Sequence, residues 1–259
     1  MSDASLNYDF RFGGIERLYG PGSLERLRQA RVLVVGIGGV GSWVAEALVR
    51  SGIGAIDLAD MDDVCESNIN RQIHALDGAI GNPKTEAMAE RCRLINPGCA
   101  VRSLNQFYTE KTSESFFDEP LDFVMDAIDS VKHKCHLIDQ CKRRSIPIIV
   151  SGGAGGRVDP TRIQSVDLSK SYNDKLLQRV RKLLRSDYGF PKQENRRFKI
   201  ECVFSPEDAY YPENCDLDEE KTSRRLDCSS GYGAATHITG AFAFIAASRI
   251  VQRIAQGRE

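Results

Sequence analysis

A glycine-rich turn early in the chain has the spacing of a phosphate-binding loop. Gly36, Gly38 and Gly41 follow the Gly-x-Gly-x-x-Gly pattern, and Gly39 adds a fourth glycine. Such spacing permits a tight turn and a close approach of the backbone to phosphate, and the N-terminus of a following helix favours an anion. Asp60, at the end of the next expected strand, suits ribose hydroxyls. These residues predict a nucleotide site but do not distinguish NAD from ATP.

Charged side chains further along the chain favour ATP. Residues 60–72 read DMDDVCESNINRQ, and Lys84 stands near an expected helix start in GNPKTEAM. An enzyme that cleaves a triphosphate needs cations such as Arg71 and Lys84, because charge on the phosphates must be neutralised as pyrophosphate leaves. Asp129, in the strand-end sequence DAIDS, is placed to hold a Mg²⁺ ion that bridges the phosphates. A dinucleotide oxidoreductase would leave both cations unexplained.

The elements that must position these residues alternate between strand and helix. Short apolar runs rich in Val and Ile predict strands, and amphipathic segments between them predict helices. The expected strands cover 31–36, 55–60, 99–104, 121–128 and 146–153, and the expected helices cover 42–52, 83–98, 110–117 and 131–145. This alternation predicts an α/β fold with a doubly wound, Rossmann-like, mostly parallel sheet flanked by helices.

The rhythm changes after about residue 155. Expected strands at 162–168 and 198–205 flank a basic amphipathic helix over 174–187. The uncharged segment 229–248 is as long as a membrane span. Its Gly, Ala, Ser and Thr content, and His237 within it, favour a helix buried in a soluble core over the alternative of membrane association.

We predict a single adenylating domain over residues 1–259, without a clean linker. Within it we expect an N-terminal helical arm (1–30), a nucleotide-binding core (31–155) and a C-terminal elaboration (156–259) for substrate binding and dimerisation.

Cysteine and histidine usage bears on metals and on the cellular compartment. None of the eight cysteines forms a Cys-x-x-Cys pair, so no structural zinc is expected. The N-terminal MSDASLNYDF lacks the basic and apolar regions of a secretory signal. We therefore expect a cytoplasmic protein with reduced thiols, most of them in the core. His133 and His136 are expected on a helix surface, without a third metal ligand.

The ordered motifs closely resemble those of the ThiF/MoeB/ubiquitin-activating adenylyltransferases. The resemblance spans residues 31 to about 150 and rests on GIGGVG, D-x-D-x-V-x-x-SN-x-x-RQ, the lysine of G-x-PK, and D-x-x-DS. It implies that Asp60 binds the ribose, that Asp129 ligates Mg²⁺, and that Asp62 belongs to the same site as the loop glycines. The residues that it assigns to phosphate contacts, with Gln72 in support, are Asn68, Arg71 and Lys84. Asn70 is left open between a phosphate contact and a turn residue, and Asp63 between the site and a solvated loop.

In that superfamily an N-terminal arginine from a second subunit often completes the site. Arg11, in DFRFGG, is the nearest candidate and Arg17 the next. The resemblance therefore implies a homodimer in which Arg11 acts in trans.

Longer stretches are similar to one subfamily, the tRNA threonylcarbamoyladenosine dehydratases. RQIHAL, NPKTEAMAER, DAIDSV, SGGAGGRVDPT and LDCSSGYGAAT carry the similarity over nearly the whole chain. It implies that ATP adenylates the carboxylate of a threonylcarbamoyl-modified adenosine next to the tRNA anticodon. A nucleophile in the same side chain would then close a five-membered ring and expel AMP, with proximity supplying much of this second step.

Several alternatives stay open. Members that charge ubiquitin-like or sulfur-carrier proteins commonly carry paired Cys-x-x-Cys ligands, whose absence weighs against that second function. A cysteine desulfurase or sulfur-acceptor system is a further candidate partner. Cys228, in DCSSGYG, is either a thioester-forming nucleophile or a structural residue, and the structural role is favoured because intramolecular cyclisation needs no covalent enzyme intermediate. His74 is expected to be structural or to lie on the substrate side.

The charge distribution bears on a nucleic-acid partner. The formal net charge of −1 argues against one. However, residues 175–199 hold nine Lys or Arg against two acids, and residues 207–220 hold seven acids without a Lys or Arg. The basic segment suits the phosphate backbone of RNA, with a solvated helix face as the alternative. Together with the resemblance, this pattern predicts tRNA as the partner and no DNA.

Overall fold

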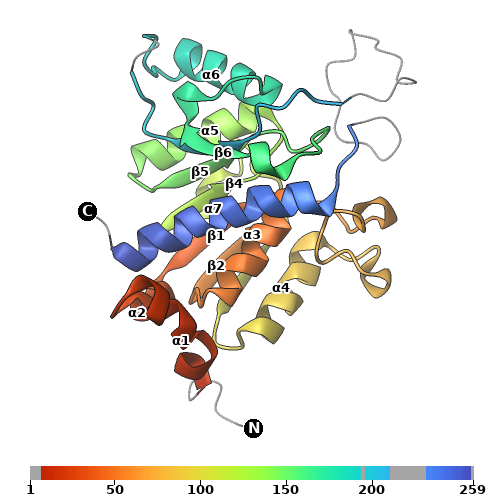
Figure 1. The fold of residues 1–259 in the computed structure, drawn as a ribbon, viewed down its shortest axis with the longest axis vertical. Helices are drawn as coiled ribbons and strands as arrows, with labels where there is room; N and C mark the ends of the chain where they lie inside the picture. Colours follow the sequence, from red (N-terminus) through yellow and green to blue (C-terminus); the bar gives the residue numbers. More distant parts are fainter. Residues whose placement is uncertain (1–6, 194–195, 211–231, 258–259) are drawn as a thin grey trace.

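A seven-stranded sheet forms the centre of the computed structural model, which describes residues 7–193, 196–210 and 232–257 (Figure 1). The strand order is β3-β2-β1-β4-β5-β7-β6. The strands are β1 (Arg31–Val35), β2 (Ala55–Ala59), β3 (Ala100–Leu104), β4 (Phe123–Asp126), β5 (Ile148–Ser151), β6 (Gln164–Asp167) and β7 (Glu201–Phe204). Every pairing is parallel except that of β6 with β7. The expected doubly wound, mostly parallel sheet is confirmed.

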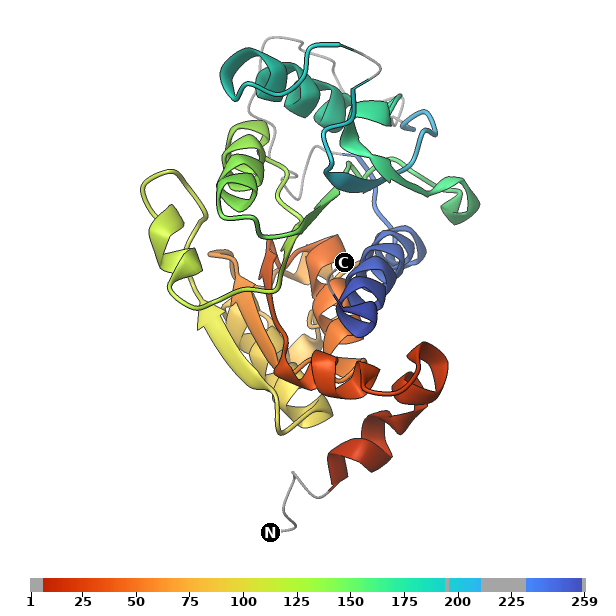
Figure 2. The same ribbon diagram turned by 90° about the vertical axis from the view of Figure 1, so that its left-hand side faces the viewer.

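Helices cover both faces of this sheet. They are α1 (Tyr8–Tyr19), α2 (Ser23–Gln29), α3 (Gly39–Arg50), α4 (Lys84–Ile95), α5 (Val131–Arg143), α6 (Lys175–Asp187) and α7 (Thr236–Gln256). Alternate side chains of β1 enter two different cores, because a strand buried on both faces points successive residues in opposite directions. Val32 and Val34 pack with α3, α4 and α7, whereas Leu33 and Val35 pack with α5 and α6. Figure 2 shows α7 and α5 on opposite sides of the sheet.

The expected helix over 110–117 is wrong. The structure has only a 3₁₀ helix there, η4 (Ser113–Phe117). Hydroxyl groups of this segment donate to nearby carbonyl oxygens: Thr112 to Phe107, Ser113 to Glu110, and Ser115 to Thr112. Such local bonds compete with a regular helix, which explains why a segment rich in Ser and Thr stops at one tight turn.

The C-terminal helix begins later and ends later than expected. Residues 229–231 lie outside the described part of the chain, and α7 continues past the uncharged segment to Gln256. The extension is stabilised by Glu201 of β7, whose carboxylate pairs with Arg249 at 2.7 Å and with Arg253. By length and composition α7 is able to cross a membrane. However, Ile238, Phe242 and further residues along it are buried in the core with α3, so α7 is a core helix of this fold.

The cysteines follow the expectation where the structure describes them. Cys92, Cys99, Cys135, Cys141 and Cys202 are buried and free, and Cys65 is exposed. Burial raises the pKa of each buried thiol, because the thiolate loses its hydration. These five thiols are therefore core groups rather than nucleophiles. Cys215 and Cys228 lie outside the described residues.

Candidate active site

The glycine loop after β1 is shaped by two close backbone approaches. Gly36 has a φ of 91°, and a Cβ there would stand 2.8 Å from the carbonyl oxygen of Ala127 in the next strand connection. A Cβ on Gly41 would overlap the carbonyl oxygen of Gly36. A Cβ on Gly38, in contrast, would meet no atom of the described part of the chain within 4 Å. The loop thus folds tightly on itself and leaves open space at Gly38, where a ligand phosphate can approach the backbone.

Helix α3 begins at this open space. Its N-cap is Gly38, and no side chain of the described residues caps the helix. The first backbone N–H groups of an α-helix have no intrahelical partner. Without a side-chain cap, those of α3 are available to a ligand, and together with the helix dipole they favour an anion. The N-terminus of α3 therefore offers a phosphate site at the carboxyl end of β1.

Asp60 ties the glycine loop to the end of β2. Its carboxylate accepts the N–H of Ile37 at 2.7 Å and the N–H of Asp62 at 2.9 Å. Burial raises the pKa of Asp60, while nearby Lys84 and the two N–H groups act in the opposite direction. One oxygen thus holds the loop and the other holds the segment that follows β2, so Asp60 fixes the geometry of the expected nucleotide site.

Lys84 and Asp62 form an ion pair beside this loop. Lys84 Nζ lies 2.9 Å from Asp62 Oδ2, and the lysine side chain is only 8% exposed. The backbone brings them together, because the N–H of Lys84 donates to the carbonyl of Asp62 at 3.0 Å and Asp63 forms a bridge with Pro83. Lys84 is the first residue of α4. The structure therefore places a nearly buried ammonium group where its charge acts on the carboxyl group of Asp60; its contact with phosphate stays a prediction.

Arg71 lies where three elements meet. Its carbonyl accepts from the indole of Trp43 on α3 at 3.1 Å and from the hydroxyl of Thr239 on α7 at 3.2 Å. Its guanidinium donates to the carbonyl of Ser67 and to the side chain of Asn70. A Cβ on Gly39 would stand 2.9 Å from Thr239 Cγ2 and 3.7 Å from Arg71 Cδ. Gly39 thus lets Arg71 and α7 approach the start of α3.

The polar residues around Arg71 have different roles. Asn68 is buried, and its side chain accepts the N–H of Cys65 at 3.2 Å. Gln72 is buried, and its Oε1 has no hydrogen-bond partner within the described chain. Asn70 donates to the carbonyl of Ala234 at 2.8 Å and accepts from Thr236 through its own carbonyl. Asn70 thereby connects this segment to the beginning of α7, which favours a structural role over a phosphate contact.

Asp129 follows the end of β4, on the neighbouring strand connection. Its side chain is exposed, and it takes part in no ion pair with the residues that the structure describes. No group of three or more His, Cys, Asp and Glu gathers within the described ranges. One free carboxylate is nevertheless a suitable donor set for Mg²⁺, which is usually held by one or two carboxylates together with substrate phosphates and water.

His133 and His136 are less exposed than expected, whereas the environment of His74 agrees with the expected structural role. His133 and His136 are partly buried rather than on an open surface, because His133 Nδ1 lies 2.9 Å from the carbonyl oxygen of Tyr108 and His136 Nδ1 lies 3.0 Å from the Tyr108 hydroxyl. His74 is 2% exposed, and burial lowers its pKa to about 4. His74 is therefore neutral at physiological pH, consistent with a structural residue.

Arg11, the first candidate for the trans-acting arginine, lies away from Lys84 within one subunit. Arg11 donates to the carbonyl of Ile95 at 3.2 Å. Ile95 ends α4 whereas Lys84 begins it, which separates them by about 16 Å along the helix at 1.5 Å per residue. Arg17 is exposed on α1. Cys228 lies outside the described residues.

One feature of the site is not evident from motif spacing. Beneath Asp129, the fully buried Lys134 pairs with the fully buried Asp126 at 2.9 Å. The sequence holds both residues, but a lysine on an amphipathic helix is ordinarily read as a surface charge. Only the packing of α5 on β4 shows that this lysine points inward.

The fold and the site define a class. A glycine loop that leads into α3, an aspartate at the end of the next strand that holds this loop, and a nearly buried lysine beside that aspartate characterise a Rossmann-like nucleotide-binding protein. The model of the ThiF family matches residues 14–258, and the chain belongs to that family.

Two tRNA threonylcarbamoyladenosine dehydratases are similar to this chain over almost its full length, and a molybdopterin-synthase adenylyltransferase over half of it. A tRNA threonylcarbamoyladenosine dehydratase of Haemophilus influenzae is 51% identical over 251 residues, covering 96% of this chain and 94% of the relative. The solved structure of the Escherichia coli tRNA N6-threonylcarbamoyladenosine dehydratase in complex with ATP is 46% identical, with a TM-score of 0.85 and coverage of 95% and 94%. A molybdopterin-synthase adenylyltransferase of Escherichia coli is 34% identical over 130 residues, half of this chain.

Proposed function

We propose that this chain is an ATP-dependent tRNA threonylcarbamoyladenosine dehydratase. The observation that carries the proposal is the full-length similarity to dehydratases, one of them solved with ATP, in a chain whose glycine loop and buried Lys84 are arranged for phosphates. The similarity to the molybdopterin-synthase enzyme stops at half of this chain. The dehydratase of Haemophilus influenzae, in contrast, matches over 96% of this chain, and this coverage supports the dehydratase over an enzyme that adenylates a carrier protein.

The first chemical step is adenylation of the substrate carboxylate. A carboxylate oxygen attacks the α-phosphorus of ATP, and the bond to the β-phosphate breaks to release pyrophosphate. The N–H groups at the start of α3 bind the phosphates, and Lys84 and Arg71 neutralise the charge that develops on the leaving group. Asp60 holds the loop and faces the ribose. Asp129 would hold Mg²⁺, which supplies further charge neutralisation on the phosphates.

The second step is intramolecular. A nucleophile in the threonylcarbamoyl side chain attacks the activated carbonyl, loses its proton, and closes a five-membered ring as AMP leaves with the carboxylate oxygen. The sum of both steps is the loss of one water from the modified adenosine. Because the reacting ends belong to one side chain, the protein contributes chiefly by positioning them. No thiol is needed for this step, so Cys228 is assigned a structural or substrate-lining role.

The proposal also includes a homodimer, a cytoplasmic location and a possible protein partner. Arg11 lies far from Lys84 in its own subunit, so its contribution requires a homodimer in which it reaches the partner site, with Arg17 as the next candidate. The C-terminal part (156–259) supplies substrate-binding and dimer surfaces around the nucleotide-binding core (31–155). The enzyme works in the cytoplasm, where its tRNA substrate is found. A cysteine desulfurase or sulfur-acceptor system is a partner to be tested separately.

A mass measurement tests the reaction. Protein, ATP and Mg²⁺ are incubated with tRNA that carries threonylcarbamoyladenosine, and the digested nucleosides are weighed. We expect the modified adenosine to lose the mass of one water and AMP to appear in equal amount. Lys84→Ala and Asp129→Ala should abolish AMP formation, whereas Arg93→Ala, at the exposed end of α4, should not.

Two outcomes would contradict the proposal. An unchanged nucleoside mass with the wild-type protein would exclude the dehydratase. Pyrophosphate exchange that depends on a carrier protein with a Gly-Gly C-terminus would support the carrier-adenylating alternative instead.

A further inference from the structure

Arg71 uses only one nitrogen of its guanidinium group in hydrogen bonds with the described chain. Its Nη1 donates to the carbonyl of Ser67 at 2.6 Å and to Oδ1 of Asn70 at 3.0 Å. Within the described residues, Nε and Nη2 donate to no group, and no carboxylate forms an ion pair with Arg71. Nε–H and one N–H of Nη2 lie side by side on one edge of the guanidinium plane, and this fork matches two oxygens of a phosphate. The contacts of Nη1 therefore leave a phosphate-binding edge available.

Asn70, which orients this guanidinium group, is itself fixed by the segment that leads into α7. Its Nδ2 donates to the carbonyl of Ala234 at 2.8 Å, and its own carbonyl accepts the hydroxyl of Thr236 at 2.6 Å. A carbonyl only accepts hydrogen bonds and a guanidinium group only donates them. The Asn70 amide therefore satisfies both neighbours in one orientation, with Nδ2 toward Ala234 and Oδ1 toward Arg71. The start of α7 thus determines which way the acceptor of Arg71 points.

The main chain of Arg71 is held by the same turn of α7. Thr236 and Thr239 are three positions apart and therefore lie on one face of the helix. Thr236 binds the carbonyl of Asn70, and Thr239 Oγ1 lies 3.2 Å from the carbonyl oxygen of Arg71. The indole of Trp43 on α3 donates to that second carbonyl at 3.1 Å. Two consecutive peptide groups are therefore fixed from α7, with α3 in support.

The segment before α7 is also anchored at its other end. The N–H of Gly156, in the turn after β5, donates to the carbonyl of Gly233 at 2.7 Å. A Cβ on Gly155 would stand 3.0 Å from Tyr232 Cβ, so this turn packs closely on the segment. Residues 232–239 thus pass from the turn after β5 to Arg71, and they join the C-terminal part of the chain to the nucleotide-binding core.

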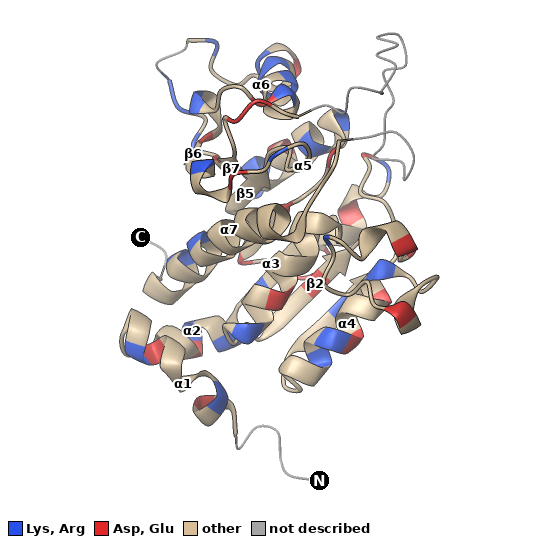
Figure 3. Ribbon diagram, turned by 45° about the vertical axis from the view of Figure 1, so that its right-hand side comes forward, with Lys and Arg blue, Asp and Glu red and all other residues tan. Residues whose placement is uncertain are grey.

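The contacts from α7 orient Arg71 without changing its charge. Residues 236–248 contain no Lys, Arg, Asp or Glu, and Figure 3 shows the beginning of α7, beside α3, without charged residues. The groups that Arg71 Nη1 contacts are amide and carbonyl oxygens. A carboxylate in their place would offset the charge of the guanidinium group, whereas neutral acceptors leave that charge for a phosphate. A guanidinium group that is already oriented also loses less side-chain entropy when it binds.

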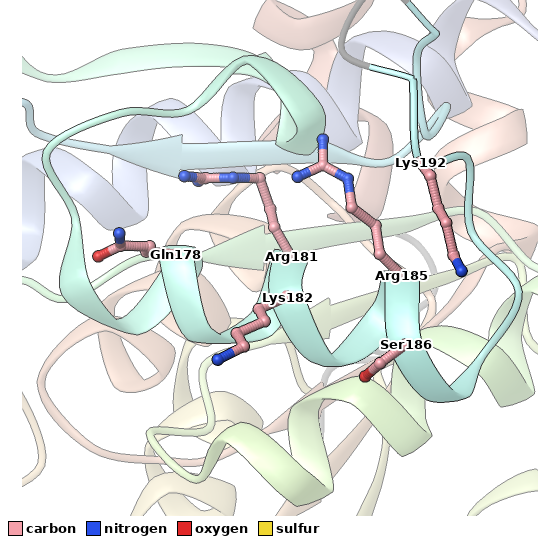
Figure 4. A pocket seen from close by; sticks show the side chains of 6 residues that line it. All are labelled: Gln178, Arg181, Lys182, Arg185, Ser186 and Lys192. Carbon is pink, nitrogen blue, oxygen red and sulfur yellow. The ribbon is translucent and has the colours of Figure 1, made fainter.

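The arginines of α6 are held by neighbours in the sequence instead. Arg181 and Arg185 line a cavity of about 520 Å³ (Figure 4). They donate to Ser171 and to the carbonyl of Pro191, which are 10 and 6 positions away. The contacts between the Arg71 segment and residues 234–239 span 164 to 168 positions. Contacts of that range form only in the folded domain, so the geometry of Arg71 depends on the C-terminal part of the chain.

We propose that Asn70 and Thr236 are positioning residues for Arg71. Through them, the start of α7 presents the Nε and Nη2 edge of the guanidinium group to the β- and γ-phosphates of ATP, which leave as pyrophosphate. This inference rests on the proposed function for the phosphate contact of Arg71. It adds that the C-terminal part of the chain contributes to the adenylation site, with each positioning residue acting through Arg71 rather than on the nucleotide.

Calorimetric titration with ATP and with AMP, both in the presence of Mg²⁺, tests this assignment without RNA. Asn70→Ala should weaken ATP binding about fivefold, the factor expected for one lost hydrogen bond. Its affinity for AMP should stay within about twofold of the wild type, because AMP lacks the phosphates that Arg71 contacts. Thr236→Val should weaken ATP binding about threefold, whereas Thr236→Ser keeps the hydroxyl and should match the wild type. Ser248→Ala, which removes an exposed hydroxyl further along α7, should also match it.

A double-mutant cycle shows whether Asn70 acts through Arg71. Arg71→Ala should weaken ATP binding at least about tenfold, because it removes charged hydrogen bonds to phosphate. Asn70→Ala/Arg71→Ala should bind ATP within about twofold of Arg71→Ala alone, since the positioning residue has nothing left to position. Losses that multiply in the double variant would show that Asn70 acts independently of Arg71 and would overturn the proposal.

The nucleotide titrations separate this inference from the reaction on tRNA. If the wild type binds ATP but leaves modified tRNA unchanged, the proposed function fails, and the selective loss of ATP affinity in Asn70→Ala still supports the positioning role. If Asn70→Ala and Thr236→Val bind ATP like the wild type, or lose ATP and AMP affinity equally, the positioning role is overturned even where dehydration occurs. Where Asn70→Ala does not fold, the comparison of Thr236→Val with Thr236→Ser decides in the same way.

Discussion

Lys134 Nζ lies 2.9 Å from Asp126 Oδ1, and neither side chain has any exposed surface. Asp126 ends β4, and Lys134 lies on the first turns of α5. The same carboxylate oxygen accepts the N–H of Ile128 at 3.0 Å. The pair therefore holds both sides of the short connection that carries Asp129. A buried ion pair thus positions the candidate Mg²⁺ ligand, although neither partner lies on the surface that a nucleotide would contact.

Lys134→Met should strongly destabilise the protein. The substitution leaves the Asp126 carboxylate buried without its counter-charge, which costs about 3–5 kcal/mol. Asp126→Asn/Lys134→Met removes both charges and should recover much of this loss. As a control, Arg143→Met removes an ion pair with Asp139 whose arginine is 69% exposed, and it should cost less than about 1 kcal/mol. Urea denaturation measures all three, and equal losses for Lys134→Met and Arg143→Met would contradict the argument.

Two glycines of the nucleotide loop should respond oppositely to alanine. Gly41→Ala forces a methyl group into the carbonyl of Gly36 and should lower the free energy of unfolding by at least about 2 kcal/mol. Gly38 has a φ of −87° and open space around it, so Gly38→Ala should change stability by less than about 1 kcal/mol. The new methyl group would occupy the space of the proposed phosphate site at the start of α3, so ATP binding should weaken about tenfold or more. Calorimetric titration with ATP, together with thermal unfolding, distinguishes the two effects.

Most of the fold follows from local patterns. Strands such as β1 and β5 are short runs of Val and Ile with both faces buried, and the amphipathic periods of α4 and α6 match their buried sides. The segment around η4 misleads because its spacing is helical while its Ser and Thr side chains bond to the backbone. Such competition depends on individual hydroxyl contacts, which periodicity does not report.

The residue types of the candidate site are predictable from the sequence, but the ion pairs and hydrogen bonds among these residues are not. The loop glycines, Asp60 and Lys84 are indicated by spacing alone. The packing of distant segments determines the ion pair of Lys84 with Asp62 and the burial of Lys134 under Asp129. The contact of Thr239 with Arg71 joins residues 168 positions apart. Long-range contacts of this kind are set by the tertiary fold, and no single-chain pattern reveals them.

Lys84 and Asp62 should differ sharply in their effect on catalysis. Lys84→Met removes a nearly buried charge from the proposed phosphate site and should lower the rate of pyrophosphate release at least about 100-fold. Asp62→Asn leaves that charge in place and releases it from its ion pair at 2.9 Å, so the rate should change by less than about tenfold. Pyrophosphate release in the presence of modified tRNA measures both. A larger loss for Asp62→Asn than for Lys84→Met would reverse the assigned roles.

His74 should make the protein less stable in mild acid. Its side chain is 2% exposed, neither ring nitrogen has a hydrogen-bond partner among the described residues, and burial lowers its pKa to about 4, with Lys84 and Arg91 adding to the effect. The unfolded chain has a histidine pKa of about 6.5. Between these two values the unfolded state binds more protons than the folded state, so stability falls as the pH decreases and levels off below about pH 4.

The expected contribution of His74 is on the order of 3 kcal/mol, since one pKa unit corresponds to about 1.4 kcal/mol. His74→Met removes the titrating group and keeps an apolar side chain of similar length in the buried position. Its free energy of unfolding should therefore depend less steeply on pH between 6.5 and 4 than that of the wild type, while the two curves run parallel above pH 7. Urea denaturation at half-unit pH steps gives both curves. Equal slopes in acid would mean that the folded chain accommodates the protonated imidazole, and the argument from burial would fail.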